Sequence, residues 1–267
     1  MKRRTFVRAS LLTGSGAGLL QSFTASAGNE PSQQNPKPEF YELRTYTLKN
    51  GRQRRVIENY FQQAAIPALN RMGSRAVGVF TEYLPQEFTK LYVLIPFQSV
   101  DDYLSMGDKL AGDSAYQQAA SEYLNAQATT PAYERIESSL LKAFTGLPRL
   151  EIPEKKPRIF ELRRYESPSE ATGKKKIEMF NEAGEIAIFK RVGLTPVFFG
   201  ETIIGPHRPN LTYMLTFDNM EEHDQNWKAF GGDPEWKKIS ALPEYANDRI
   251  LSNIHRTFLV PTAFSQV

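Results

Sequence analysis

The chain contains one segment twice, and this internal repeat restricts its fold more than any other feature. Residues Phe40–Tyr46, with the sequence FYELRTY, return as Ile159–Tyr165, with the sequence IFELRRY. Later landmarks keep the same offset of about 119 to 120 residues: Phe61 and Phe180, Gly73 and Gly193, Phe97 and Phe217, Gly112-Asp113 and Gly232-Asp233. An offset that holds over a domain length indicates a duplicated domain. Each copy is too small to cover both faces of a sheet, so we expect the two copies to cover each other.

The first 27 residues have the features of a twin-arginine signal peptide. A basic segment, Lys2–Arg8, precedes a short and mildly apolar stretch, and Ala25-Ser26-Ala27 supplies the small residues that a signal peptidase requires. The apolar stretch is too short and too rich in Gly and Ser to span a bilayer, which takes about 20 residues. We therefore predict export by the twin-arginine route, to the periplasm or out of the cell, with no transmembrane segment in the mature chain.

The composition of the mature chain excludes several classes of function. Removal of residues 1–27 takes away four basic residues and no acidic one, which changes the formal net charge from +3 to −1. Without a basic excess, nucleic acid is not an expected partner. The chain has no cysteine, which excludes disulfides, thiolate metal sites and cysteine nucleophiles.

Two stretches rich in Pro and polar residues divide the mature chain. Residues 28–38 contain almost no apolar side chain, and we predict a disordered tether there. Residues 146–158 contain Pro148, Pro153 and Pro157 and are predicted to form a semi-stiff linker. The predicted domains are therefore residues 39–145 and residues 159–261.

Each domain is predicted to have the element order β-α-β-β-α-β, the ferredoxin-like order. A strand of alternating polarity comes first, and an apolar stripe at helical spacing follows, from Val56 to Leu69 and from Ile177 to Phe189. Pro67 is expected to kink the first of these helices, and Gly184 is expected in the interior of the second. The remaining strands are predicted at residues 76–82, 91–97, 136–144, 196–203, 211–217 and 253–260. The second helix of each domain is expected to begin at Ser99 and at Asp218 or Asn219.

Both helices of a ferredoxin-like domain cover one face of its sheet and leave the other face bare. We predict an α+β fold in which the two tandem repeats pack through their sheets as a pseudo-twofold dimeric α/β barrel. The alternative is two separate domains that each dimerise with another chain, and the linker length excludes neither arrangement. The chain is therefore also a candidate homo-oligomer.

Three motifs resemble those of the NIPSNAP family, which belongs to the dimeric α/β-barrel superfamily. They are Glu-Leu-Arg-x-Tyr at the start of each copy, Gly184-Glu185-Ile186-Ala187-Ile188-Phe189 running into Val192-Gly193, and Trp227-x-x-Phe230 followed by Asp233-Pro234-x-Trp236. The resemblance covers about residues 39–144 and 158–260. It implies the barrel but no agreed reaction, because the superfamily includes cofactor-free monooxygenases, haem-handling enzymes and plain binding modules.

The first copy departs from this resemblance at three positions. Tyr116 stands where the second copy has Trp236, Ala65 where it has Glu185, and Tyr103 where it has His223. The second copy is therefore the one expected to carry any site, with the first copy as its structural partner.

The opening strand of each copy carries a glutamate, an arginine and a tyrosine on one face. The residues are Glu42, Arg44 and Tyr46 in the first copy and Glu161, Arg163 and Tyr165 in the second. One hypothesis places both sets inside the barrel, where they bind a polar group of a ligand. The other makes each set a satisfied ion-pair and hydrogen-bond network that fixes how the sheets dock.

Four further residues are ligand-binding candidates. Glu185 either borders a pocket or is a solvated carboxylate on the helix flank, and His223 and Trp227 either edge a cavity or belong to the core. His255 lies on the closing strand, and His207 is expected at an exposed hairpin tip. A single His223 or His255 is also the only candidate haem ligand, and no residue spacing predicts a metal site.

We therefore predict an exported NIPSNAP-domain protein that binds a small apolar or amphipathic ligand, or a protein, in the barrel interior between the two repeats. The alternatives are a cofactor-independent monooxygenase-like enzyme acting on an apolar substrate, and a haem-binding protein. No cofactor is predicted, and no catalytic residue is assigned. The oxygenase hypothesis requires a cavity bordered by Glu185, His223, Trp227 or Tyr165.

Overall fold

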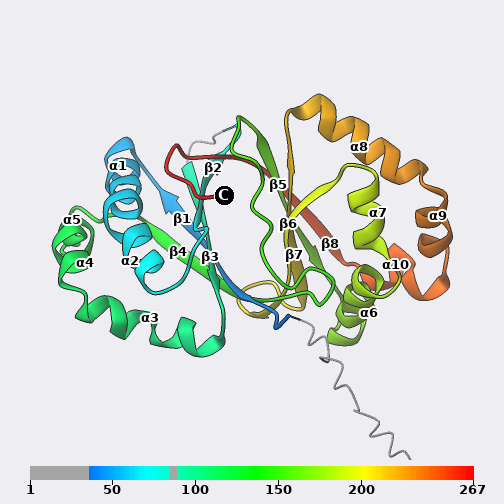
Figure 1. Ribbon diagram of the computed structural model, residues 1–267, viewed down its shortest axis with the longest axis horizontal. Coiled ribbons are helices and arrows are strands. Elements are labelled where there is room, and N and C mark those ends of the chain that lie inside the picture. The colour runs from blue at the N-terminus through cyan, green and yellow to red at the C-terminus, as the bar shows by residue number, and fades with distance from the viewer. Residues whose placement is uncertain (1–35, 85–88) are drawn as a thin grey trace, which may run out of the picture. The chain divides into compact units, whose positions relative to one another are not determined.

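Eight strands close into one barrel, with the helices of the first repeat on one side and those of the second repeat on the other (Figure 1). The computed structural model describes residues 36–84 and 89–267. The predicted signal peptide, residues 1–27, and residues 28–35 of the predicted tether lie outside the described residues. The predicted α+β class and the barrel built from two ferredoxin-like repeats are confirmed.

The elements of the two repeats follow the same order, with short helices added. The first repeat contains β1 (Phe40–Leu48), α1 (Gly51–Asn59), the π-helix η1 (Tyr60–Ala65), α2 (Ile66–Arg71), β2 (Gly78–Glu82), β3 (Thr89–Phe97), α3 (Val100–Gly112), α4 (Ser114–Ala119), α5 (Ser121–Leu124) and β4 (Arg135–Ala143). The second contains β5 (Ile159–Glu166), α6 (Glu170–Asn181), α7 (Glu185–Arg191), β6 (Thr195–Ile204), β7 (Asn210–Phe217), α8 (Met220–Gly232), α9 (Pro234–Ser240), the 3₁₀-helix η2 (Pro243–Tyr245), α10 (Asn247–Ile250) and β8 (Asn253–Pro261).

The two sheets join at both edges to form the barrel. The order around the ring is β1-β3-β2-β8-β5-β7-β6-β4, and all the pairings are antiparallel. Within a repeat the order is that of a ferredoxin-like sheet. Two seams connect the repeats, with Phe80 of β2 opposite Pro261 of β8 and Ala143 of β4 opposite Gly200 of β6. Each of these strands therefore has a neighbour on both sides, and the barrel closes within one chain.

Alternate residues of each strand face the barrel interior or the helices. On β1, Tyr41 packs in the interior cluster, whereas Tyr46 packs under the helices. On β5, Phe160 and Leu162 face the interior, whereas Tyr165 faces the helices. Both faces of the barrel wall are therefore apolar and buried over most of their length.

Aromatic rings fill much of the barrel interior. The rings of Tyr41 and Phe198 lie 5.3 Å apart between centroids, and those of Phe80 and Phe160 lie 4.9 Å apart. All four side chains are fully buried. The middle of the barrel is a packed core, and any space for a ligand lies toward its ends.

Helix boundaries differ from the prediction at Gly184. The expected single helix is two, because α6 ends at Asn181 and α7 begins at Glu185. Gly184 separates them with a φ of +95°, a left-handed conformation that glycine adopts without steric cost. Gly184 is therefore a helix N-cap, not a helix-interior glycine.

A kink was expected at Pro67, and the structure has an irregular helical segment just before that residue. Residues Tyr60–Ala65 form a π-helix, and Ile66 donates its N–H to the carbonyl oxygen of Phe61, five residues earlier. At the second helices, Ser99 and Asn219 accept backbone hydrogen bonds as N-caps, as predicted.

The linker and the chain end lie over one end of the barrel. Glu151 in the linker donates its N–H to the carbonyl oxygen of Val197 on β6 at 2.9 Å. After β8 the chain runs back along β2: Thr262 donates to the carbonyl oxygen of Val79 at 2.9 Å, and Gln266 donates to that of Val77 at 3.0 Å. Residues 146–158 are thus packed against the barrel, not extended away from it.

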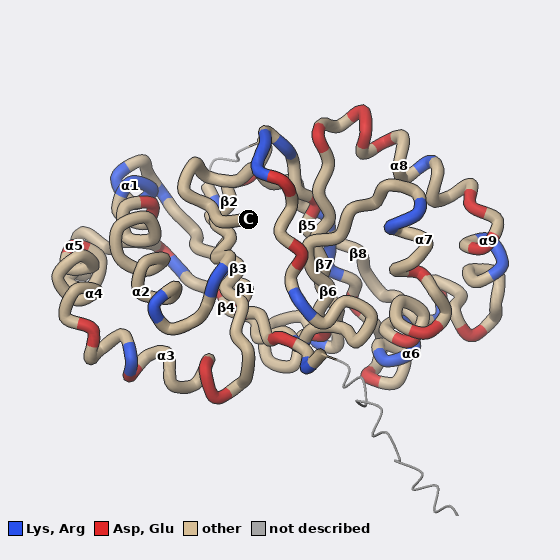
Figure 2. Tube along the Cα trace, in the orientation of Figure 1, with Lys and Arg blue, Asp and Glu red and all other residues tan. Residues whose placement is uncertain are grey.

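Charged residues of both signs are interspersed along the outer helices, for example on α3 and α9 (Figure 2). This mixture is typical of a solvated surface and not of a phosphate-binding face. None of the helices in the described part of the chain combines the length and apolarity needed to cross a membrane.

The seam between β4 and β6 gives a test of the closed barrel. A Cβ added at Gly200 would lie 2.9 Å from Leu141 Cβ, which cannot rotate away. We expect Gly200→Ala to lower the free energy of unfolding of the full chain by about 1–3 kcal/mol, because it overpacks the seam. Urea unfolding followed by circular dichroism measures this change.

Gly107→Ala is the matched control for this substitution. Gly107 lies in α3 with nothing within 4 Å of an added Cβ, so we expect it to be neutral or stabilising by about 0.5–1 kcal/mol. Equal effects of the two substitutions would contradict the close approach of the two repeats at this seam.

Candidate functional site

The six predicted strand residues lie between the sheet and the helices. The centroid of the Tyr46 ring is 5.6 Å from that of Phe61 in η1, and the Tyr165 ring is 6.5 Å from that of Phe180 in α6. The hypothesis that placed both sets inside the barrel is therefore wrong. A period of two defines two faces of a strand, and because both faces are buried here, the pattern did not distinguish them.

In the first repeat, Glu42 and Arg44 form a two-pronged ion pair. The guanidinium contacts the carboxylate through Nε–Oε1 and Nη2–Oε2, both at 2.7 Å. Ser138 of β4 donates its hydroxyl to Glu42 Oε1 at 2.6 Å, and Arg44 Nη2 lies 3.9 Å from the sulfur of Met106 in α3. The pair therefore links β1 to its neighbouring strand and to a helix.

A cluster of tyrosines surrounds this pair and was not assigned to any site from the sequence. The Tyr60 and Tyr116 hydroxyls are 2.9 Å apart, and the Tyr60 ring stacks on Tyr123 at 3.8 Å between centroids. Burial raises the pKa of the Tyr60 and Tyr123 phenols well above the usual value. These phenols are therefore neutral hydrogen-bonding groups that hold the helices of the first repeat together.

In the second repeat, Arg163 is the centre of a larger network. Its Nη1 donates to Glu161 Oε1 at 2.6 Å, and its Nη2 donates to the Tyr165 hydroxyl at 3.0 Å. Tyr213 donates to the same hydroxyl at 2.9 Å, and Trp227 Nε1 donates to Glu161 Oε2 at 2.9 Å. The guanidinium also lies 4.3 Å from the centroid of the Trp227 ring. The network joins β5 and β7 to α8.

His223 is enclosed by the same network. Its Nε2 lies 3.3 Å from Glu161 Oε2, and its Nδ1 is 2.8 Å from Asp224 Oδ1. Its ring packs edge-on against Phe217 and Phe258, at 4.9 and 5.1 Å between centroids. His223 is therefore buried among aromatic rings.

Glu185 is paired with a lysine that the sequence analysis missed. Its Oε2 lies 2.8 Å from Lys176 Nζ, and the two residues are 2% and 1% exposed. Burial raises the pKa of the Glu185 carboxyl, while the charges of Lys176 and Arg163 oppose the rise. The hypothesis that Glu185 is a solvated carboxylate on the helix flank is therefore wrong.

The position of Lys176 gave a weak signal for this pairing. Lys176 belongs to a run of three lysines, which is typical of a solvated helix face, but it lies four residues before the buried Phe180. Its ammonium is 4.6 Å from the centroid of the Phe180 ring.

We call this set the helix-side cluster: Glu161, Arg163, Lys176, Glu185 and His223. The rings of Phe189 and Trp227 beside it are 5.7 Å apart, and those of Phe189 and Phe230 are 4.8 Å apart. Side chains thus fill the space that a substrate would need. Arg163 Nε and His223 Nε2 have no hydrogen-bond partner among the described residues, but Glu161, Arg163, Lys176 and Glu185 are joined to one another or to neighbouring side chains by hydrogen bonds. Hydrogen-bonded charges at this depth fix the docking of the helices on the sheet.

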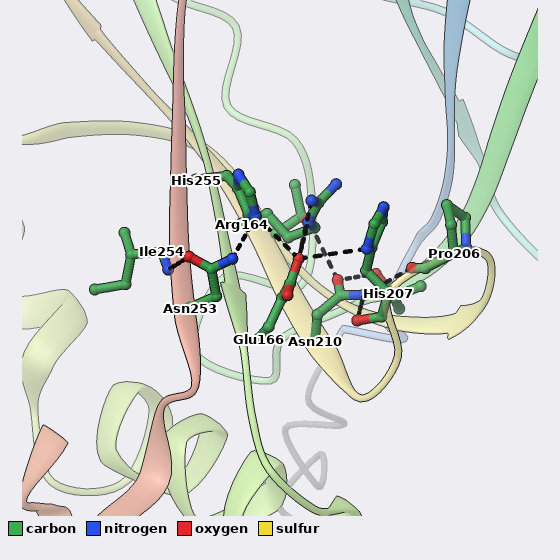
Figure 3. A network of polar contacts seen from close by, with 10 residues as sticks. Arg164, Glu166, Pro206, His207, Asn210, Asn253, Ile254 and His255 are labelled. Atoms are coloured by element: carbon green, nitrogen blue, oxygen red, sulfur yellow. Dashed lines mark hydrogen bonds and ion pairs between the residues drawn. The ribbon is translucent and has the colours of Figure 1, made fainter. Parts of the chain in front are cut away.

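His255, the remaining predicted residue, lies at one end of the barrel beside a polar cavity. On β5, Arg164 contacts Glu166 Oε1 through Nη2 at 2.9 Å, and His255 Nε2 lies 3.3 Å from the same oxygen (Figure 3). His207, on the turn between β6 and β7, is 3.7 Å from it. The adjoining cavity, which we call the polar cavity, has a volume of about 210 Å³.

A larger cavity lies at the opposite end of β5, and we call it the linker chamber. It has a volume of about 600 Å³ and is lined by residues 152–158, Phe160 and residues 261–267. Its lining is largely apolar, with Ile152, Phe264 and Val267 beside Phe160. The chamber is thus enclosed by the linker, the end of the chain and the barrel interior.

Two residues that line the linker chamber each carry a buried polar atom that has no hydrogen-bond partner among the described residues. They are Arg158 Nε and Thr262 Oγ1. The terminal nitrogens of Arg158 are engaged, since Nη1 donates to Thr216 Oγ1 at 3.2 Å and Nη2 donates to the carbonyl oxygen of Glu154. Unpartnered buried donors are rare and are satisfied in most proteins by water or a ligand.

The linker chamber had no signal in the sequence. Residues 146–158 and the residues after 261 were assigned to a linker or to no domain, because their composition is typical of connecting segments. Only their packing on the barrel brings them together, and that packing depends on contacts between segments distant in the sequence.

The histidines do not provide a site that fits haem. His223 contacts Glu161 and Asp224, and His255 Nε2 is 2.8 Å from Asn253 Nδ2. The linker chamber is the larger of the two cavities, and its lining contains no histidine. Within the described ranges, no group of three or more His, Asp or Glu side chains is placed to hold a metal ion.

Three solved structures are similar to this chain. A putative monooxygenase from Lactobacillus acidophilus is 12% identical, with a TM-score of 0.58 over 84% of this chain and 94% of that one. A putative monooxygenase from Fusobacterium nucleatum is 10% identical, with a TM-score of 0.53 over 84% and 93%. A NIPSNAP-like domain protein from Burkholderia xenovorans is 21% identical, with a TM-score of 0.36 over 40% and 88%. The first two show a shared fold alone.

Comparison with curated protein sequences gives no match. The family comparison is specific, because one family model matches each repeat separately. It covers residues 41–145 and residues 160–266, which include both Glu-x-Arg-x-Tyr strands and both sets of helices. The chain belongs to the NIPSNAP family.

Proposed function

We propose that this protein is an exported binding module that holds a small amphipathic ligand in the linker chamber. The observation that carries the proposal is a chamber of about 600 Å³ with a largely apolar lining that also includes the cationic side chains of Lys155 and Arg158. Small-molecule sites have this size and consist of an apolar wall with a few polar groups that orient the ligand. Export rests on the predicted twin-arginine signal peptide.

The chemistry of the chamber favours a ligand with an acidic head group. Arg158 and Lys155 are positively charged, and Lys156 is paired with Asp218 at 2.7 Å. A carboxylate in the chamber would be attracted to the positive charges of Arg158 and Lys155. The apolar part of the ligand would contact Ile152 and Phe264. A medium-length fatty acid has this combination.

The alternative, a cofactor-independent oxygenase, has less support from the geometry. It requires a cavity beside Glu185, His223, Trp227 or Tyr165, and the rings of Phe189, Phe230 and Trp227 occupy that space. The two similar structures named as monooxygenases share the fold, which does not determine chemistry. In our proposal the helix-side cluster is structural, and the barrel is a scaffold for the chamber.

The first test is the binding of decanoate to the full chain by isothermal titration calorimetry. We expect one molecule of decanoate per chain, and we expect Arg158→Gln to weaken binding about tenfold to a hundredfold. The reason is that a hydrogen bond to a charged group contributes about 1.5–3 kcal/mol. Decanol, which has the same chain without the carboxylate, is expected to bind more weakly than decanoate.

Arg135→Gln is the control, because Arg135 is exposed on β4 and does not line the linker chamber. Ile152→Trp is a second test, since Ile152 is 60% exposed and a larger side chain there narrows the chamber without disturbing the core. The proposal fails if decanoate does not bind, or if Arg158→Gln and Ile152→Trp leave its affinity unchanged.

The helix-side cluster gives a separate prediction about stability. Lys176→Met leaves the buried Glu185 without its partner, so we expect a loss of about 3–5 kcal/mol in the free energy of unfolding. In the double variant Lys176→Met/Glu185→Leu both charges are absent, and we expect most of this loss to be recovered. Urea unfolding of the full chain distinguishes the two variants.

Decanoate titration of the same variants tests whether the linker chamber binds the ligand while the helix-side cluster only stabilises the fold. We expect the double variant to bind decanoate with the affinity of the unaltered protein, because the linker chamber lies at the barrel end and not beneath α6 and α7. A large loss of affinity in a stably folded double variant would show that the cluster belongs to the ligand site.

A further inference from the structure

The polar cavity at the other end of the barrel is lined by a different chemistry from that of the linker chamber. Ten of its thirteen lining residues have polar side chains, and the other three are Leu43, Leu162 and Pro206. Its volume of about 210 Å³ corresponds to about seven water molecules at about 30 Å³ each. It is therefore a small hydrophilic space above an apolar floor.

The first repeat forms one wall of the polar cavity. Thr45 on β1 is opposite Tyr92 of β3 and Glu137 of β4 in the strand register, and all three line the cavity. The Tyr92 hydroxyl lies 3.5 Å from Glu82 Oε1, and burial, with the charge of Glu82, raises the Tyr92 pKa to about 12. This wall presents a phenol, a threonine hydroxyl and a carboxylate, together with the ammonium of Lys90.

The second repeat forms the facing wall. Arg164 on β5 is opposite Thr212 of β7 and His255 of β8, and these three also line the cavity. In the eight-stranded ring β1 and β5 lie four places apart, so the two walls face each other across the barrel. A ligand between them meets hydrogen-bond donors and acceptors on both sides.

The charges around the polar cavity are nearly balanced. Arg164 is paired with Glu166, and Lys90 and Glu137 line the cavity on either side of β1. The polar cavity therefore has no excess positive charge that would select an anion. The side chains of Lys90 and Arg164 line it directly, and their positive charges disfavour binding of a cation.

Several lining groups are held in place before any ligand arrives. Asn210 donates to the carbonyl oxygens of Pro206 and His207 and accepts from Thr202 at 2.6 Å. Figure 3 shows how Asn210, Arg164 and His255 converge near Glu166 at the end of the sheet. Fixed polar groups lower the entropy cost of binding a small polar molecule.

We propose that the polar cavity binds a neutral polyhydroxylated molecule of the size of one monosaccharide. A sugar hydroxyl donates and accepts at once, which matches a cavity with a guanidinium and an imidazole on one wall and a carboxylate on the other. A hexose carries about as many oxygens as the waters it would displace, so each hydroxyl replaces one water. This site is independent of the linker chamber and of the proposal made for it.

The test is a ligand-observed NMR titration of the full chain with D-glucose, D-galactose, D-mannose, D-xylose and myo-inositol. Sodium gluconate and glutamate serve as the charged and zwitterionic comparisons. We expect saturable binding of at least one neutral compound, and weaker binding of both charged compounds. We expect Glu137→Ala and Lys90→Met each to weaken the binding about fivefold or more, since each removes a hydrogen-bonding group.

Glu122→Ala and Lys174→Met are matched controls, because both residues are exposed on helices outside the cavity. They are expected to leave the affinity unchanged. Glu137 and Lys90 are also exposed, so their variants should fold, which circular dichroism verifies. The proposal is overturned if none of the neutral compounds binds, if gluconate or glutamate binds more tightly than all of them, or if Glu137→Ala and Lys90→Met behave like the controls.

Discussion

The fold depends on hydrogen bonding between the sheet edges of the two repeats. A four-stranded ferredoxin-like sheet has two edges and a bare apolar face, and both would be exposed if a repeat stood alone. Pairing of β2 with β8 and of β4 with β6 satisfies all four edges and encloses both bare faces in one interior. The apolar core of the barrel, the placement of the helices outside it and the location of the cavities all follow from this closure.

Closure also determines where a ligand can bind. Aromatic rings from both repeats fill the middle of the barrel, and the helix-side cluster is filled by Trp227, Phe189 and their neighbours. The linker chamber and the polar cavity lie where strands end and side chains from the two repeats no longer meet. At one end the linker and residues 261–267 cover that space with apolar side chains, and at the other it is lined by polar ones. The two ends of one barrel therefore have cavities of different chemistry.

The repeat and the element order could be predicted from the sequence, because they rest on local patterns: the 119-to-120-residue offset, the apolar stripes and the helix caps at Ser99 and Asn219. The sequence could not predict whether Glu161 and Arg163 face the barrel interior or the helices. A strand that is buried on both sides has the same alternation whichever face points inward. The prediction that Gly184 lies inside one helix was wrong for a related reason. An apolar stripe continues across a break between two helices when both helices pack on the same core. Lys176 and the linker chamber depend on contacts between distant segments, which no local pattern records.

Fusion of the two repeats in one chain is what makes both cavities chemically asymmetric. In a barrel built from two identical chains, the residues around the axis are identical on both walls, so Thr45 would face another Thr45 and Glu137 another Glu137. In this chain the second repeat has Arg164 and His255 at those places, so the two walls of the cavity carry different side chains. The linker chamber needs the fusion even more directly, because residues 152–158 exist only as the connection between repeats. Two repeats in one chain can therefore diverge independently, and each end of the barrel can combine walls of different chemistry, which two identical chains cannot do.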